Sequence, residues 1–258
     1  GPTPSQTPTS TPGALSLRDC AQTHGVQIGA AVAAKPLRND PLYGETLTQH
    51  FGMLTPENAM KFGPLHPAPE RYDFGDADFI VDFAQAHGMH VRGHVLVWHN
   101  QLPGWLTNKD WSREELMAIL RDHILTVVGR YRGRVMAWDV VNEAFTDDGT
   151  WRDTIWLRVI GPEYVEFAFR WAHEADPDAL LFYNDYNAEG LCPKADAVHT
   201  LVEDLVQRGV PIHGVGFQMH IGLDWRPSTE EDAANIARLN DVGLQVHITE
   251  MDVRVPEP

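Results

Sequence analysis

Cysteine is almost absent from this chain, which has only Cys20 and Cys192 among its 258 residues. Two cysteines cannot build a disulfide scaffold, and their separation matches no zinc-binding spacing. We therefore expect two free thiols, with one long-range disulfide as the alternative.

Basic residues are scarce as well: the chain carries 20 Lys and Arg against 36 Asp and Glu, a net charge of −16. Nucleic acids and anionic membranes both require a basic surface, so neither is an expected partner. The sequence also has no apolar run near the roughly 20 residues that cross a bilayer. These shortages exclude classes of partner, and the excess of acidic residues mainly favours solubility.

Residues 1–13 contain little that could join a core, since ten of these 13 are Pro, Thr or Ser. Such a segment cannot bury apolar surface, which predicts a disordered linker over residues 1–13. Linkers of this composition often tether the modules of secreted proteins, so we expect a secreted, extracellular protein. Residues 14–258 should then form a single domain.

Seven short apolar segments are typical of strands that are buried in a parallel sheet. They cover residues 26–32, 51–55, 89–98, 135–143, 179–183, 212–218 and 244–250. Helical spacing predicts helices over residues 15–24, 72–87, 112–131, 164–176, 198–208 and 228–239. Ser112 with Glu115, and Ser228 with Glu231, form capping boxes at two of these helices. The alternation of strands and helices predicts a parallel α/β fold.

Polar residues gather at the carboxyl ends of most of these strands, which favours a closed (β/α)8 TIM barrel over an open doubly wound sheet. No glycine-rich phosphate loop follows a strand, and Gly214 and Gly216 lie inside one, where they should serve packing. An eighth strand and helix are absent, and seven strands would leave two apolar edges unpaired. We therefore expect a domain truncated after strand seven. A further segment or chain would supply strand eight, and the protein would otherwise be a monomer.

Glu143 and Glu250 end the fourth and seventh expected strands. A barrel of eight strands about 4.8 Å apart, tilted by about 36°, would place the two carboxyl groups about 6 Å from each other. A retaining glycosidase needs about 5–5.5 Å and an inverting one about 6.5–9.5 Å, so the estimate agrees with retention and leaves inversion open. Glu143, beside Trp138, is the better candidate for the protonated acid, because burial disfavours a charge. Glu250 should be the ionised nucleophile, held by His220 and Asp252.

Six sequence blocks resemble those of the glycoside hydrolase family 10 endo-1,4-β-xylanases, and they occur in that family's order. They are Glu57-Asn58-Ala59-Met60-Lys61, Gly93-His94-Val95-Leu96-Val97-Trp98-His99-Asn100-Gln101, Trp138-Asp139-Val140-Val141-Asn142-Glu143, Asn184-Asp185-Tyr186-Asn187, Gln218-Met219-His220 and Ile248-Thr249-Glu250-Met251-Asp252. The resemblance extends from about residue 15 to the end of the chain. It implies a retaining (β/α)8 hydrolase that cuts internal β-1,4-xylosidic bonds of xylan and xylo-oligosaccharides. It makes Glu143 the acid/base and Glu250 the nucleophile.

The same resemblance implies roles for further residues. Asn142 would hydrogen-bond the 2-hydroxyl of the reacting sugar. Other substrate contacts are implied for Glu57, Asn58, Lys61, His94, Trp98, Gln101, Asn184, Tyr186 and Gln218. Sugar hydroxyls need fixed donors and acceptors, and apolar sugar faces rest on aromatic rings. The chain departs from the family in one respect, because the tryptophans of the eighth strand that help to wall the reacting sugar are not present.

Three alternatives stay open. A sugar-binding module would bind xylo-oligosaccharides tightly without turnover, and a barrel of the same family could act mainly on β-1,4-glucans. A catalytic metal is the third, since the chain has 13 histidines. The first expected strand carries none of them, and no cysteine accompanies those at the other strands, so we expect neither a metal nor another cofactor. Outside the six blocks, Trp105, Trp151 and Trp225 are expected to serve packing.

Overall fold

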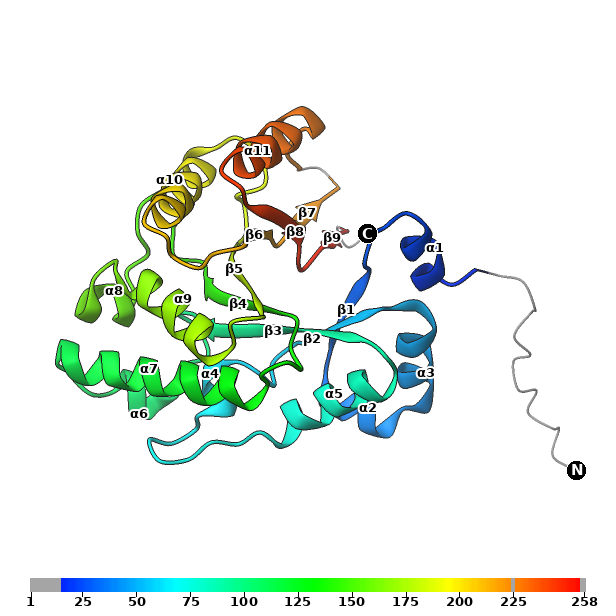
Figure 1. Cartoon of the computed structure of the whole chain (residues 1–258), viewed down its shortest axis with the longest axis horizontal. Coiled ribbons are helices and arrows are strands. Elements are labelled where there is room, and N and C mark those ends of the chain that lie inside the picture. The colour runs from blue at the N-terminus through cyan, green and yellow to red at the C-terminus, as the bar shows by residue number, and fades with distance from the viewer. Residues whose placement is uncertain (1–14, 224–225, 256–258) are drawn as a thin grey trace, which may run out of the picture.

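A curled parallel sheet lies at the centre of the structure, with helices around its outer side (Figure 1). Its seven strands pair in the order β1-β2-β3-β4-β5-β6-β8. They are β1 Gly29–Val32, β2 Met53–Pro56, β3 His90–Val97, β4 Ala137–Asn142, β5 Leu180–Asp185, β6 Gly214–Phe217 and β8 Gln245–Ile248. Strands β3 to β6 are buried along most of their length, as expected where helices cover one face and the barrel interior lies on the other. The predicted α/β-barrel class is confirmed.

The computed structural model describes residues 15–223 and 226–255. The predicted linker over residues 1–13, Trp225 and residues 256–258 lie outside the described residues. The linker and the secretion inferred from it therefore stay predictions. Trp105 and Trp151 are partly buried against the core, which confirms their expected packing role.

All six predicted helices are present, and their observed ends lie within a few residues of the expected ones. The described residues also form short helices that the sequence did not indicate. The complete set is α1 Leu17–Thr23, α2 Ala34–Asn39, α3 Pro41–His50, α4 Phe62–Leu65, α5 Gly75–Ala86, α6 Gly104–Thr107, α7 Arg113–Arg130, α8 Ile155–Ile160, α9 Tyr164–Ala175, α10 Pro193–Gln207 and α11 Thr229–Asp241. The missed helices α2, α3, α4, α6 and α8 have between 4 and 10 residues. Helices of this length are too short to display a repeating apolar face.

The two predicted capping boxes are both formed. At α7 the Ser112 hydroxyl accepts from the Glu115 N–H at 3.2 Å, and the Ser112 N–H donates to the Glu115 carboxylate at 2.9 Å. At α11 Ser228 and Glu231 make the same reciprocal pair at 3.2 and 3.1 Å. Each box satisfies two backbone N–H groups that a helix start leaves free, so the local sequence marks where these helices begin.

Two glycines of β6 make room for neighbouring side chains. A Cβ atom on Gly214 would lie 2.3 Å from the Phe182 ring, and one on Gly216 would lie 2.2 Å from the Asn184 Oδ1 atom. Distances this short are impossible between non-bonded heavy atoms, so a side chain at either position would displace its neighbour. The expected packing role of both glycines is confirmed.

A second, two-stranded parallel sheet consists of β7 His220–Gly222 and β9 Asp252–Arg254. It was not predicted, and it corrects the seventh expected strand, because β8 ends at Ile248 rather than at residue 250. His220 pairs with Asp252 in this small sheet. The segments that follow β6 and β8 are thus tied together beyond the barrel.

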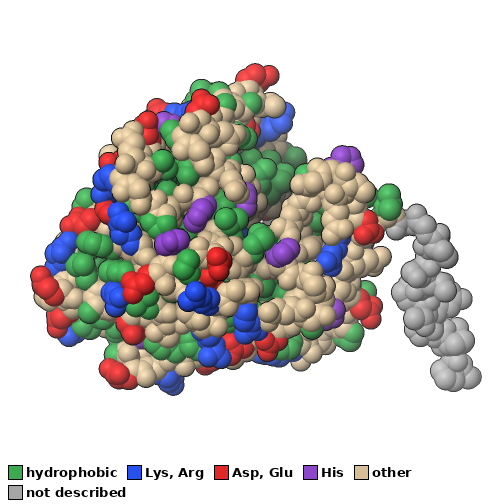
Figure 2. Space-filling view, viewed as in Figure 1, with side chains coloured by type: hydrophobic (Ala, Val, Ile, Leu, Met, Phe, Trp, Pro, Cys, Tyr) green, Lys and Arg blue, Asp and Glu red, His purple; other side chains and the backbone are tan. Residues whose placement is uncertain are grey.

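The long sheet is open between β1 and β8, which form its two ends within the described ranges. In the space-filling view the surface is hollowed between the lobe that carries α10 and α11 and the lobe that carries α1 and α3 (Figure 2). Large apolar side chains in or next to β7, β8 and β9 are exposed, among them Leu223, Ile248, Met251, Val253 and Val255. Two edges are therefore unpaired, as the count of seven strands predicted.

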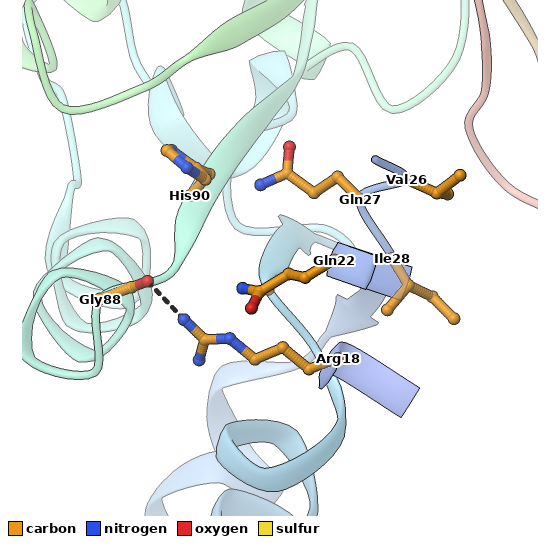
Figure 3. A pocket seen from close by; sticks show the side chains of 8 residues that line it. Arg18, Gln22, Val26, Gln27, Ile28, Gly88 and His90 are labelled. Carbon is orange, nitrogen blue, oxygen red and sulfur yellow. Dashed lines mark hydrogen bonds between the residues drawn. The ribbon is translucent and has the colours of Figure 1, made fainter. Parts of the chain in front are cut away.

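A polar cavity of about 130 Å³ lies at the amino-terminal end of the strands (Figure 3). Arg18, Gln22, Gln27 and His90 are among the residues that line it, and an Arg18 guanidinium N–H donates to the Gly88 carbonyl at 2.9 Å. In parallel barrels this end supports stability, while the chemistry takes place at the carboxyl ends of the strands. We therefore place the functional site at the opposite end.

Both cysteines are free thiols, as expected. Cys192 caps α10: its sulfur accepts from the Ala195 N–H at 3.4 Å, and its thiol lies 3.2 Å from the Asn187 carbonyl oxygen. No helix within residues 15–223 and 226–255 is long and apolar enough to span a membrane.

His123 of α7 is fully buried in an aromatic stack. Its ring centroid lies 3.8 Å from that of Phe62 and 5.7 Å from that of His66, with nearly parallel planes. Neither ring nitrogen has a hydrogen-bond partner among the described residues. Burial, and to a smaller extent His66, lowers the pKa of His123 well below its ordinary value of 6.5. Just below pH 6.5, His123 is therefore neutral in the folded protein but protonated in the unfolded chain.

We expect His123 to weaken the fold as the pH falls. A histidine with a lowered pKa in the folded state supports folding fully above about pH 6.5, and this support is lost as the pH falls towards the folded-state pKa. The free energy of unfolding from urea titrations should drop by about 1.4 kcal/mol more per pH unit below about pH 6 in the wild type than in His123→Phe. His87→Phe removes an exposed histidine and should keep the wild-type slope. Equal slopes for His123→Phe and the wild type would contradict this.

Candidate active site

Glu143 and Glu250 occupy the carboxyl ends of β4 and β8 and are joined by hydrogen-bonded amides. Glu143 Oε1 accepts from Asn142 Nδ2 and from Gln218 Nε2, each at 3.1 Å. Glu250 Oε1 accepts from Asn184 Nδ2 at 2.7 Å. The Glu143 side chain is 11% exposed and the Glu250 side chain 28%, so both still reach the surface of the site.

The amides of Asn142, Asn184 and Gln218 also bind one another. Asn142 Oδ1 accepts from Asn184 Nδ2 at 2.9 Å and from Gln218 Nε2 at 3.1 Å. Asn184 Oδ1 accepts from the Thr249 hydroxyl at 2.7 Å. All polar atoms of the Asn184 side chain are thus engaged within the protein, and the residue has no exposed surface. The structure places Asn184 behind the carboxylates, where it orients Glu250 and Asn142.

Four non-glycine residues with positive φ follow the carboxyl ends of β3 to β6. They are Gln101 at 52°, Glu143 at 57°, Asn187 at 52° and Met219 at 58°. A left-handed conformation costs a non-glycine residue on the order of 1–2 kcal/mol and persists only where the surroundings enforce it. Their common position at one end of the barrel marks that end as the functional one.

Three histidines surround the two carboxylates. His94 Nδ1 lies 3.9 Å from Glu250 Oε1, and His220 Nε2 lies 3.5 Å from Glu250 Oε2. His99 Nδ1 lies 3.9 Å from Glu143 Oε2, and burial, followed by the charge of Arg152, lowers the pKa of His99. The expected support of Glu250 by Asp252 is indirect, because Asp252 Oδ2 binds His220 Nδ1 at 2.7 Å.

A buried ion pair lies beneath this layer and was missed in the sequence. Arg92 Nε donates to both oxygens of Asp139 at 3.0 and 3.1 Å, and Asp139 Oδ2 also binds His94 Nδ1 at 3.0 Å. Burial raises the pKa of Asp139, but Arg92 and the His94 hydrogen bond outweigh it, and the pKa lies below its ordinary value. Arg92 reaches across the barrel to His247 at 3.2 Å. A charged residue inside an apolar strand needs a buried partner, and this rule was the signal that could have revealed the pair.

A polar group on the loops after β2 and β3 brings together four of the residues implied to bind substrate. Asn58 Oδ1 accepts from Lys61 Nζ and from Gln101 Nε2, each at 3.2 Å. Lys61 Nζ lies 5.0 Å from the ring centroid of Trp98. Burial lowers the pKa of Lys61, while the charges of Glu250, Glu57 and Glu143 oppose this shift. The lysine therefore lies within the electrostatic reach of both carboxylates.

Tyr186, another residue implied to bind substrate, is half-buried and contacts two basic side chains. Its hydroxyl accepts from Arg152 Nη2 at 2.9 Å, and Lys194 Nζ lies 3.4 Å from its ring centroid. Arg152 and Lys194 were not singled out in the sequence, because isolated basic residues outside a motif carry no local signal. Among residues 15–223 and 226–255, no cluster of three His, Cys, Asp or Glu side chains is placed to hold a metal ion.

A parallel barrel that presents two carboxylates and fixed amide donors at its strand carboxyl ends is the architecture of a hydrolase that cleaves glycosides by acid–base chemistry. Comparison with known proteins agrees with this class. The profile described as Glycosyl hydrolase family 10 matches residues 16–258. The chain belongs to this family.

Several relatives that match the chain are named as xylanases, and one is named as an exoglucanase. Endo-1,4-beta-xylanase B of Thermotoga neapolitana is 50% identical over 245 residues, which make up 94% of this chain and 70% of that protein. The beta-1,4-xylanase of Dictyoglomus thermophilum is 49% identical over 88% of this chain and 63% of its own length. The crystal structure of xylanase 10B from Thermotoga petrophila RKU-1, in complex with xylobiose, has a TM-score of 0.92 at 46% identity. The structural match covers 96% of this chain and 76% of the Thermotoga petrophila chain. This chain thus spans part of the length of each relative.

Proposed function

We propose that this protein is a retaining endo-1,4-β-xylanase that hydrolyses internal bonds of xylan and xylo-oligosaccharides by double displacement. The observation that carries the proposal is the joint placement of Glu143 and Glu250 on one network of buried amides, in a chain of family 10. A network of this kind fixes the direction in which each carboxylate points. Xylanase names among the relatives, and the xylobiose bound to one of them, support the substrate class.

In the first step Glu250 attacks the anomeric carbon while Glu143 donates its proton to the glycosidic oxygen. The bond from the anomeric carbon to the leaving oxygen breaks, and an ester between the sugar and Glu250 forms. In the second step Glu143 takes a proton from water, the water oxygen attacks the same carbon, and Glu250 is released. Asn142 Nδ2 has one N–H beyond its bond to Glu143, which suits a hydrogen bond to a sugar hydroxyl.

The polar group formed by Asn58, Lys61, Trp98 and Gln101 suits sugars on one side of the cleavage point. Lys61 and Gln101 both donate to Asn58, so their remaining N–H groups are held in fixed directions. The Trp98 indole adds a flat apolar surface of the kind on which sugar rings rest. Glu57 is exposed beside this group and can accept from sugar hydroxyls. We propose that Glu57, Asn58, Lys61 and Gln101 bind sugars beyond the cleavage point on the non-reducing side, and that Trp98 contacts the reacting sugar itself.

Proton NMR during the digestion of xylohexaose tests the reaction as a whole. We expect new reducing ends whose first anomer is β, because two inversions at the same carbon retain its configuration. Products of intermediate length should precede xylose if the enzyme cuts inside the chain. An α-anomer would point to inversion, and tight binding without new reducing ends would point to a sugar-binding module. Faster cleavage of cellohexaose in the same assay would favour a glucan-cleaving enzyme.

Substitution of each glutamate separates the two proposed roles. Glu250→Ala should reduce the hydrolysis of xylan to background while substrate binding by calorimetry persists, since the nucleophile forms the covalent bond. Glu143→Ala should lower kcat/KM on xylo-oligosaccharides by about 100-fold or more, and should spare aryl glycosides whose leaving groups need little protonation. Near-normal rates of Glu250→Ala on xylan would rule out the assignment.

We also propose that a further segment or a second chain pairs with the outer edges of β1 and β8. A hollow of about 330 Å³ beside β1 supports this, because residues such as Ala30, Tyr43, Leu47 and Phe51 line it with apolar surface. Unpaired apolar edges of this kind bind other strands readily. Such a unit would close the barrel next to Glu250.

Amide hydrogen exchange, measured on the natural protein isolated from the organism that makes it, tests this pairing. Outward N–H groups of β1 and β8 should exchange slowly, because a partner strand protects them. Light scattering then separates the two sources, since a second copy doubles the 28.9 kDa mass of the chain and a further segment of the same chain does not. Fast exchange at both edges would contradict the proposal.

A further inference from the structure

Two buried charged residues behind Glu143 take no direct part in either step of the proposed reaction. Lys194 and Asp185 have no exposed surface, and Lys194 Nζ lies 2.8 Å from Asp185 Oδ1. Burying two charges is costly, and nothing in the barrel core requires them, since apolar residues of similar size would fill the same space. Their position between the β4–α8 loop and the start of α10 connects them to the main chain of Glu143.

The main chain at Glu143 is held on all sides by hydrogen bonds. Its N–H donates to the Asn184 carbonyl at 2.9 Å, and its carbonyl accepts from Arg152 Nε at 2.9 Å. The next peptide is held equally, since the Ala144 N–H donates to the Tyr183 hydroxyl oxygen at 3.0 Å and the Ala144 carbonyl accepts from the Arg152 N–H at 2.8 Å. These bonds enforce the left-handed φ of 57° at Glu143.

Two series of side-chain contacts, called arms below, connect Lys194 to the main chain at Glu143 and Ala144. In the first, Lys194 pairs with Asp185, and Asp185 Oδ2 accepts from the Tyr183 hydroxyl at 2.6 Å. Because the Tyr183 proton is directed at Asp185, the lone pairs of its oxygen face the Ala144 N–H. The carboxylate of Asp185 thus sets the direction of the bond that holds the peptide after Glu143.

The second arm passes over the Tyr186 ring. Lys194 Nζ lies 3.4 Å from the ring centroid, and the Tyr186 hydroxyl accepts from Arg152 Nη2 at 2.9 Å. Arg152 in turn binds the carbonyls of Glu143 and Phe145, both at 2.9 Å. Lys194 Nζ also lies 3.3 Å from Asp147 Oδ1 in the same loop. Both arms therefore end on the main chain at or next to Glu143.

We propose that Lys194 is a positioning residue for Glu143: through Asp185–Tyr183 and through Tyr186–Arg152 it holds the strained turn that aims the acid/base carboxyl at the leaving oxygen. This inference rests on the proposed function, since it needs Glu143 to act as the acid. Burial raises the pKa of Asp185 to about 6, while Lys194 opposes that rise. Loss of the ammonium would therefore favour the neutral form of Asp185 and weaken its hold on Tyr183.

The test compares two substrates in Lys194→Met, which keeps the length of the side chain and removes the charge. Xylo-oligosaccharides have poor leaving groups and need the acid, whereas 2,4-dinitrophenyl β-xylobioside needs almost no protonation. A displaced acid should lower kcat/KM by about 30-fold or more on the first substrate and by less than about 3-fold on the second. Lys109→Met is a matched control, because Lys109 also lies over an aromatic ring and near a glutamate, at the surface. It should keep wild-type rates on both substrates.

The outcomes separate this inference from the function on which it rests. Equal losses on both substrates, or no loss on either, would show that Lys194 supports only the fold and would overturn the inference. If Glu143→Ala itself shows no difference between the two substrates, the acid/base assignment fails and this inference fails with it. Should Lys194→Met not fold, as judged by circular dichroism, Tyr183→Phe breaks the first arm by removing one oxygen. It should show the same split, and uniform rates in that variant would overturn the inference.

Discussion

The hydrogen bond from Asn184 Nδ2 to Glu250 Oε1 is the interaction on which the site depends, because it ties the end of β5 to a carboxylate that follows β8. The same amide donates to Asn142, which holds Glu143. Neutral amides can both donate and accept, so they connect two anionic side chains without adding a charge between them. A charged residue in the place of Asn184 would either repel Glu250 or neutralise it. The site therefore needs an uncharged connector at its centre.

Beneath this neutral layer the barrel contains full charges that are paired and buried. Arg92 binds Asp139 and reaches His247, while Lys194 binds Asp185. Removing one member of such a pair costs about 3–5 kcal/mol, because it leaves the other charge uncompensated in the interior. These pairs make weak contributions to stability, but each fixes the direction of a group next to the carboxylates. Asp139 fixes the imidazole of His94, and Asp185 fixes the hydroxyl of Tyr183.

The sequence predicted those parts of the fold that are set by local pattern. Continuous apolar segments marked β3 to β6, and the pairs Ser112 with Glu115 and Ser228 with Glu231 marked the starts of α7 and α11. The short helices α2, α4 and α8 escaped, because one or two turns have no repeating face. The small sheet of β7 and β9 escaped for another reason: each strand has three residues, and pairing between them depends on the barrel that brings them together.

The candidate site shows the same division. Glu143 and Glu250 could be found, because a carboxylate that ends an apolar strand is visible in a single segment of sequence. Arg152 and Lys194 could not, since their significance arises only when the loop after β4 packs against α10. For Asn184 the motif was recognised, but the sequence could not reveal that its amide faces the protein rather than the solvent. The sequence therefore identifies the carboxylates proposed to react, whereas the residues that hold them in position can be recognised only in the tertiary structure.

Gly216 has a consequence that reaches beyond packing. The space above its Cα is taken by the Asn184 side-chain oxygen on one side and by the Thr249 methyl on the other. The Asn184 amide and the Thr249 side chain can thus keep their positions only because residue 216 has no Cβ atom. Substitutions at position 216 should therefore be rare among proteins that descend from this one, even though the residue touches no ligand. A comparison of variants would then single out, as one of its least tolerant positions, a residue with no functional group of its own.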